Sequence, residues 1–225
     1  MRVLVAGGCG FIGHRVSCSL RDAGHEIRVV DSLTDYGLYE SREHARRLES
    51  RLSLMDGIAI DRVDLRNSEG ISDLIRTFKP ECVVHLGNVP AASFASDRPV
   101  DAAQVIVGGT MSLLEGARRF EVRRFVYVSS SMVYGNFTRD PIDEDHRCAP
   151  LDAYGSLKAT CEQLVRMYSE AGGFEHSIVR PSAVYGPTGN ETFVLSKFLH
   201  AARSSGLIRV LGVLTKIEFT VVDDV

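Results

Sequence analysis

The sequence predicts an α/β protein built on a doubly wound parallel sheet. Short runs rich in β-branched residues alternate with longer stretches of helical periodicity, and a glycine-rich loop separates the first run from the first helical stretch. Strands that alternate with helices pair in parallel through right-handed crossovers. In chain order the expected elements are strand Arg2 to Ala6, helix Phe11 to Ala23, strand Glu26 to Val30, strand Ile58 to Val63, helix Ser68 to Phe78, strand Cys82 to Leu86, helix Val100 to Phe120, strand Arg124 to Ser129, helix Tyr154 to Ala171 and strand Ser177 to Arg180.

The composition and net charge of the chain indicate which kinds of partner it can bind. The 225 residues are 44% hydrophobic and 24% charged, as in an ordinary soluble globular protein, and the net charge of -3 gives no basic surface for nucleic acid. The five cysteines are odd in number and contain no Cys-x-x-Cys pair, which favours a reducing compartment over a disulfide framework or a zinc site. The chain enters a strand directly and has no bilayer-length apolar segment. We expect a cytoplasmic protein with a small-molecule partner, no nucleic acid and no membrane.

The glycine-rich loop predicts a dinucleotide site. Gly7 allows a tight turn after the strand, Gly10 lets the backbone approach phosphate oxygens, and Gly13 lets the helix lie close to the strand. The positive end of that helix then faces the anion. Asp31 follows the next strand, where its carboxylate accepts hydrogen bonds from ribose hydroxyls and repels a phosphate, so NAD is expected rather than NADP. An alternative, a loop that only packs a helix on a sheet, leaves Asp31 unexplained.

Tyr154 and Lys158 predict acid-base chemistry. They are four residues apart and share one face of the expected helix. Lowering a phenol pKa from about 10 to about 7 requires roughly 4 kcal/mol, and an ammonium about 4.5 Å away supplies close to that amount at an effective dielectric constant near 20. The hydroxyls of Ser129, Ser130 and Ser131 end a strand at the same edge of the sheet. A solvated pair on the surface of an amphipathic helix is the alternative interpretation.

With these motifs the chain resembles the extended short-chain dehydrogenases/reductases of the nucleotide-sugar epimerase/dehydratase group. The resemblance implies a Rossmann-type NAD-binding domain over residues 1–180 and a small, incomplete substrate lobe over 181–225. It also implies a homodimer formed through the helices Val100 to Phe120 and Tyr154 to Ala171. The matching residues are Gly7, Gly10, Gly13, Asp31, Asp64 with Leu65, His85 with Leu86, Ser130 with Tyr134 and Gly135, Tyr154 with Lys158, and Arg180 with Pro181 before Val184 to Pro187.

The same resemblance implies a role for each site residue. Tyr154 as phenolate takes the proton of the sugar 4-hydroxyl, Ser130 holds that oxygen, and Lys158 tunes the tyrosine and binds the nicotinamide ribose. Asp64 and Leu65 line the adenine pocket. The implied cofactor-binding residues are Gly7, Gly10, Phe11, Ile12, Gly13, Asp31, Asp64, Leu65, Leu86, Tyr154 and Lys158.

The implied activity is NAD-dependent nucleotide-sugar 4-epimerisation, in which a 4-keto sugar rotates in the site and is reduced on its other face. Dehydratases of the family carry Asp and Glu where this chain has Ser131 and Met132, which disfavours that alternative. A 4-ketoreductase or dehydrogenase is another alternative.

The substrate pocket departs from the family pattern at several positions. The family often has Asn where this chain has Ile106 and Ala183, and Gly87 to Pro90 replaces a run of small residues. The departures at Asn88 and Ala183 keep open an inactive dinucleotide-binding sensor. The loop Asp31 to Gly37, followed by an Arg-rich helix, resembles that of nucleotide-uronic-acid epimerases, so a UDP-sugar or UDP-uronic acid is the expected substrate.

Overall fold

Six parallel strands form the central sheet of the protein. The computed structural model describes residues 1–34, 36–37, 41–89, 91–139, 141–189, 194–204, 206 and 218–225. The strands lie in the order β3-β2-β1-β4-β5-β6, and this arrangement confirms the predicted doubly wound α/β fold. Their bounds are β1 Arg2–Ala6, β2 Glu26–Asp31, β3 Ala59–Arg62, β4 Cys82–His85, β5 Arg124–Val128 and β6 Glu175–Val179.

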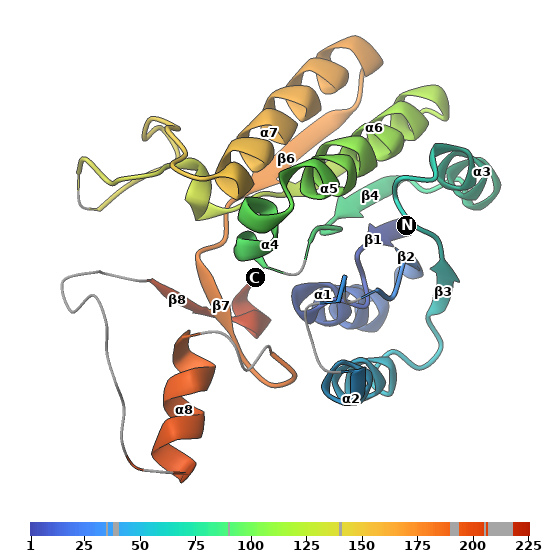
Figure 1. Ribbon diagram of the computed structural model, residues 1–225. Coiled ribbons are helices and arrows are strands. Elements are labelled where there is room, and N and C mark those ends of the chain that lie inside the picture. The colour runs from blue at the N-terminus through green and yellow to red at the C-terminus, as the bar shows by residue number, and fades with distance from the viewer. Residues whose placement is uncertain are drawn as a thin grey trace.

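Helices cover both faces of this sheet. Figure 1 shows α1 and α2 on one face and α3, α6 and α7 on the other. The helix expected from Val100 to Phe120 consists of α5, the π-helix Gln104–Gly108 and α6 in direct succession. The helix bounds are α1 Phe11–Asp22, α2 Ser41–Leu52, α3 Ser68–Phe78, α4 Ala92–Asp97, α5 Pro99–Ala103, α6 Gly109–Arg119 and α7 Ala153–Gly172.

The order of the strands creates a crevice between β1 and β4. From β1 the chain proceeds outward through β2 and β3, and it then returns to the other side of β1 to form β4, β5 and β6. The crossovers therefore diverge at β1 and β4, leaving a gap at the carboxyl ends of these strands. In open α/β sheets ligands bind at this switch point.

Apolar side chains of β1 are buried on both faces of the sheet. Leu4 and Ala6 belong to the cluster that packs under α3 and α6, whereas Val3 and Val5 belong to the cluster under α1 and α2. Side chains alternate between the two faces of a strand, so a central parallel strand must be apolar throughout. This explains why β1 is apolar from Val3 to Ala6.

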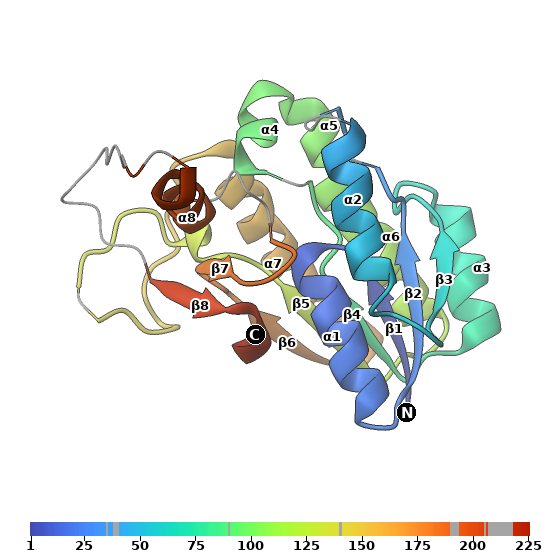
Figure 2. The same ribbon diagram turned by 90° about the horizontal axis from the view of Figure 1, so that it is seen from below.

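The C-terminal segment adds a second, two-stranded sheet beside the first. Strands β7 (Ala183–Tyr185) and β8 (Phe219–Val221) pair in parallel, and α8 spans Val194–Ser204. In Figures 1 and 2 these elements lie to one side of the main sheet. A short 3-10 helix, Val222–Asp224, follows, and Arg15 of α1 forms an ion pair with Asp223 there. The domain boundary at 180/181 stays a prediction.

Within the described residues, no helix combines the length and the apolar character that crossing a bilayer requires. All five cysteines are free thiols.

A buried ion pair connects the end of β6 with α7. The Arg180 guanidinium donates to both carboxylate oxygens of Glu162, at 2.8 and 2.6 Å, and the Glu162 side chain is only 2% exposed. Arg180 also donates to the Tyr134 hydroxyl at 2.9 Å and lies over that ring. Burial by itself would raise the pKa of Glu162, but the guanidinium keeps it below the ordinary value.

Breaking this pair should destabilise the protein strongly. Arg180→Met leaves the Glu162 carboxylate buried with only the longer contact to Arg166, at 3.4 Å, so we expect the free energy of unfolding to fall by about 3–5 kcal/mol in urea titrations at neutral pH. Because the folded-state pKa of Glu162 is lowered, the contribution of the pair is present above the ordinary carboxyl pKa and is lost as the pH falls through the lowered one. The difference between wild type and variant should shrink accordingly in acid.

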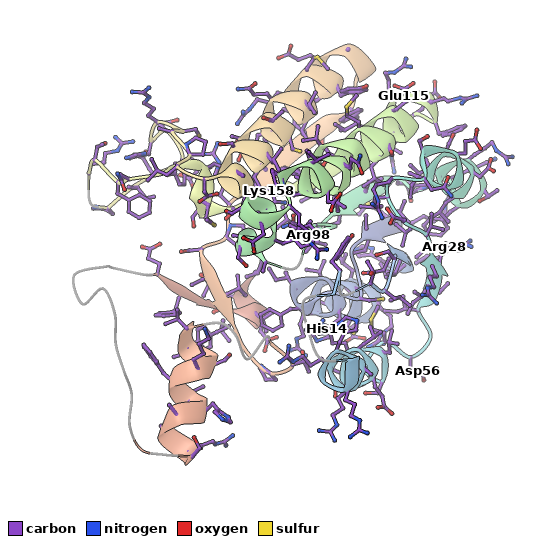
Figure 3. All side chains as sticks on the ribbon, viewed as in Figure 1. His14, Arg28, Asp56, Arg98, Glu115 and Lys158 are labelled. Carbon is purple, nitrogen blue, oxygen red and sulfur yellow. The ribbon has the colours of Figure 1, made fainter. Side chains whose placement is uncertain are left out.

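The matched control is Arg118→Met on α6, whose partner Glu115, labelled in Figure 3, is half exposed. An exposed pair of this kind contributes at most about 1 kcal/mol. Equal losses for the two variants would contradict the assigned role of Arg180.

Candidate active site

A cavity of about 540 Å³ opens at the switch point between β1 and β4. Its walls come from the loops after β1, β2, β3, β4, β5 and β6 and from the first turns of α1 and α7. His14 of α1 and Lys158 of α7, labelled in Figure 3, mark the helices on its two sides. The structure brings every predicted site residue to this cavity: Gly7, Gly10, Phe11, Ile12, Gly13, Asp31, Asp64, Leu65, Leu86, Ser130, Tyr154 and Lys158.

The glycine-rich loop turns the chain from β1 directly into α1. Gly7 has a φ of +77°, in the left-handed region, and its N–H donates to the Val30 carbonyl at 2.8 Å. A Cβ on Gly13 would lie 2.8 Å from the Gly8 Cα and would overlap the Gly7 carbonyl oxygen. Since α1 can approach the loop this closely only without a Cβ, its positive N-terminal end is held at the cavity wall. This cradle fits the pyrophosphate of a dinucleotide.

Asp31 is held in place by two backbone amides. Its carboxylate accepts from Cys9 N at 3.0 Å and from Leu33 N at 2.9 Å. Burial raises the pKa of Asp31, and these two hydrogen bonds oppose the effect. A carboxylate oxygen accepts more than one hydrogen bond, so Asp31 keeps acceptor capacity for ribose hydroxyls. These residues fit NAD.

Asp64, which also lines the cavity, forms an ion pair with Arg66. Both of its oxygens accept from the Arg66 guanidinium, at 3.0 and 2.7 Å. The Arg66 side chain therefore lowers the pKa of Asp64 and keeps it charged. This pair was not predicted from the sequence.

The start of α7, which carries Tyr154, packs against the segment that follows Ser130. The Asp152 side chain caps the helix by accepting from Gly155 N at 2.8 Å. A Cβ on Gly155 would lie 2.5 Å from the Met132 carbonyl oxygen, so α7 packs directly on the 3-10 helix Ser131–Val133. Ser130 is the N-cap of that short helix, and its Oγ accepts from Met132 N at 3.2 Å.

Lys158 is buried beneath the cavity rather than solvated. Its side chain is among the largest fully buried ones, and Nζ donates to the Val128 carbonyl at 2.8 Å. The ammonium lies 4.8 Å from the centre of the Tyr127 ring. Burial lowers the pKa of Lys158 to about 8, while Cys161 and Glu162 act in the opposite direction. The alternative of a surface pair with Tyr154 is therefore wrong.

The expected lowering of the Tyr154 pKa by Lys158 is not observed. Burial raises the pKa of the Tyr154 phenol to about 12; a hydrogen bond from Asn88 lowers it, and Asp152 raises it. The Lys158 ammonium binds the Val128 carbonyl instead of the phenol. The free energy of removing a phenolate from water outweighs the attraction expected from the four-residue spacing.

Several contacts that hold the walls of the cavity were not predicted from the sequence. His14, fully buried, contacts the Gly10 carbonyl at 3.1 Å and the Thr188 hydroxyl at 3.2 Å through its two ring nitrogens. Arg51 of α2 donates to the Thr188 carbonyl at 2.9 Å. These contacts fasten the loop after β7 to the glycine-rich loop. No local pattern could have indicated them, because they join residues up to 174 positions apart.

A Rossmann-type sheet with a dinucleotide cradle beside Ser130, Tyr154 and Lys158 defines a nicotinamide-dependent enzyme of the short-chain dehydrogenase/reductase type. The chain belongs to the NAD dependent epimerase/dehydratase family, which it matches over residues 3–225. The family, the fold class and the NAD dependence predicted from the sequence are thereby confirmed. The roles of individual residues stay predictions.

Three similar proteins illustrate this family. The UDP-glucuronate 4-epimerase of Thermodesulfobacterium geofontis is 29% identical over 224 residues, which cover 99% of this chain and 68% of that protein. The UDP-glucose 4-epimerase of Thermus thermophilus, in complex with NAD, superimposes with a TM-score of 0.81 at 26% identity, covering 100% of this chain and 71% of the other.

The UDP-glucuronic acid 4-epimerase of Bacillus cereus, in complex with UDP-glucuronic acid and NAD, superimposes with a TM-score of 0.84 at 25% identity. The superposition covers 100% of this chain and 70% of the other. The chain thus spans about two thirds of the length of its relatives. Their names agree with the predicted class of enzyme.

The close approach of α1 to the loop should be required for cofactor binding. Gly13→Ala places a methyl group against backbone atoms, so we expect the free energy of unfolding to fall by about 1–3 kcal/mol and NAD to bind at least about tenfold more weakly, since α1 must move away. Urea unfolding and calorimetric titration with NAD measure both effects.

Gly108→Ala is the matched control, because a Cβ at that helical glycine meets nothing within 4 Å. Its free energy of unfolding should stay within about 1 kcal/mol of wild type. Undiminished NAD affinity of Gly13→Ala would show that the cradle is not the cofactor site.

Proposed function

We propose that this chain is the catalytic part of an NAD-dependent nucleotide-sugar 4-epimerase. One observation carries the proposal: Ser130, Tyr154 and Lys158 line the same cavity as the glycine-rich cradle and Asp31. The epimerases among its relatives support the proposal.

In this proposal the residues of the chain divide the proton chemistry. The glycine-rich cradle and Asp31 would hold NAD, which would supply reversible hydride transfer at carbon 4 of the sugar. Tyr154, as phenolate, removes the proton of the 4-hydroxyl and returns it after the 4-keto sugar has rotated. Ser130 donates a hydrogen bond to the same oxygen and relays the proton. Lys158, held by the Val128 carbonyl, binds the nicotinamide ribose and contributes positive charge.

The alternatives of dehydration and net reduction have less support. Dehydration needs a further acid or base near carbon 5 and carbon 6. Met132, which lines the cavity where the family's dehydratases carry a carboxylate, cannot transfer a proton. A ketoreductase or dehydrogenase would consume or release one NADH per turnover, whereas an epimerase regenerates its cofactor. An inactive sensor is disfavoured by the complete set of Ser130, Tyr154 and Lys158.

We propose a UDP-sugar or a UDP-uronic acid as the substrate, and residues 181–225 as part of the lobe that binds it. In support, Ser182, Ala183, Tyr185 and Phe219 of this segment line the same cavity as Tyr154. The loop from Asp31 to Gly37 resembles that of uronic-acid epimerases, although Asp35 lies outside the described residues.

We also propose a cytoplasmic homodimer. Helices α6 and α7 lie side by side on the outside of the sheet (Figure 1), with Met111 and Met167 exposed. Exposed apolar side chains on two neighbouring helices suit a four-helix dimer interface. Free cysteines, among them the exposed Cys148, suit a reducing compartment.

Removing the phenolic oxygen should abolish epimerisation. Tyr154→Phe eliminates the proposed base, so we expect turnover to fall by about 10²–10⁴-fold while NAD remains bound. A panel of UDP-, GDP- and dTDP-sugars, with epimers identified by NMR and NADH followed by absorbance, measures the effect.

Tyr168→Phe, further along α7 and packed against the core, is the control and should keep wild-type turnover. Full activity of Tyr154→Phe would refute the mechanism. Stoichiometric production or consumption of NADH by the wild type would favour the dehydrogenase or reductase instead.

A further inference from the structure

We infer that Asn88 is a positioning residue for Tyr154, whose phenolate it stabilises by donating a hydrogen bond from its side-chain amide. This inference rests on the proposed function, in which Tyr154 acts as the base. It assigns a purpose to a position where the family pattern has small residues.

The geometry places the amide directly on the phenolic oxygen. Asn88 Nδ2 lies 2.6 Å from the Tyr154 hydroxyl oxygen, in a hydrogen bond that joins residues 66 positions apart. Asn88 lies three residues beyond β4, and both side chains line the cavity at the switch point. The bond therefore holds the reacting oxygen, which belongs to α7, from the loop after β4.

The surroundings of the Asn88 amide oxygen support the assignment of the NH₂ group as the one that faces the Tyr154 hydroxyl. Asn88 Oδ1 is buried and has no hydrogen-bond partner among the described residues. The reverse orientation of the amide would bury an NH₂ group, with two donors, at that unpaired place, which costs more than one unpaired acceptor. A phenolate only accepts hydrogen bonds, so an N–H donor is the partner that favours its charged form.

Among the residues that the structure describes, the other groups around Tyr154 do not stabilise its phenolate by a hydrogen bond. The carboxylate of Asp152 at the start of α7 opposes ionisation of the phenol, as does burial. Tyr127 of β5 is itself deeply buried with a raised pKa and stays neutral. Lys158, one turn further along α7, donates to the Val128 carbonyl. Asn88 alone among these side chains donates a hydrogen bond to the phenol, and this bond lowers the Tyr154 pKa.

The test measures the Tyr154 phenolate directly by its ultraviolet absorbance. The 225-residue chain, saturated with NAD, is compared at one alkaline pH as wild type, Asn88→Ala and Asn88→Asp, and the spectrum of each protein's Tyr154→Phe counterpart is subtracted. Loss of a hydrogen bond to a charged group should lower the phenolate fraction about tenfold in Asn88→Ala. Asn88→Asp has nearly the same volume but adds negative charge, so its fraction should fall further. Asn136→Ala, an exposed asparagine, is the control and should match wild type.

The outcomes separate this inference from the proposed function. Equal phenolate fractions in wild type and Asn88→Ala, or an Asn88→Asp variant equal to wild type, would overturn the role of Asn88 whatever the activity. Turnover that survives Tyr154→Phe would instead overturn the epimerase mechanism and leave the spectroscopic result standing. Where both hold, the acidic limb of kcat against pH should move upward by about one pH unit in Asn88→Ala, with KM nearly unchanged.

Discussion

Parallel pairing of β1 with both β2 and β4 is the constraint on which the rest of the structure depends. It sends the carboxyl ends of all six main strands to one edge of the sheet and leaves a crevice where the crossovers diverge. Residues as far apart in sequence as Gly7, Ser130 and Tyr154 meet at one cavity for this reason. Gly13 lets α1 pack closely on the glycine-rich loop, and Gly155 lets α7 pack closely on the 3-10 helix Ser131–Val133. These two contacts determine how near the first turns of both helices come to a ligand.

Burial dominates the electrostatics of this cavity. It raises the pKa of Tyr154 and lowers that of Lys158, so both side chains are pushed toward their neutral forms. A base at this position requires compensation from nearby donors and positive charge. The Asn88 amide supplies part of it at 2.6 Å. A Tyr-Lys pair is thus insufficient when only its spacing is considered, because the same low-dielectric surroundings that strengthen their attraction also penalise each charge.

Polar contacts between distant segments hold the walls of the cavity together. The Arg180–Glu162 pair ties the end of β6 to α7. On the other side, His14 and Arg51 hold Thr188 over the glycine-rich loop. Buried pairs and hydrogen bonds of this kind fix geometry because each partner would be costly to leave unpaired.

The sequence by itself determined the elements and the composition of the site. The bounds of β1 and α3 agree with the expected Arg2 to Ala6 and Ser68 to Phe78, since apolar periodicity and capping residues act locally. The glycine spacing, Asp31, Ser130, Tyr154 and Lys158 were likewise legible, because each motif reflects a local backbone requirement. Only the tertiary structure decided that α4 forms, because a helix of six residues is too short to show periodicity. It also decided that Lys158 donates to the Val128 carbonyl and that Asn88 donates to the Tyr154 hydroxyl. The rise of the Tyr154 pKa likewise follows from the folded structure. Burial and contacts between distant segments exist only once the chain has folded, and the free energy of desolvation follows from them.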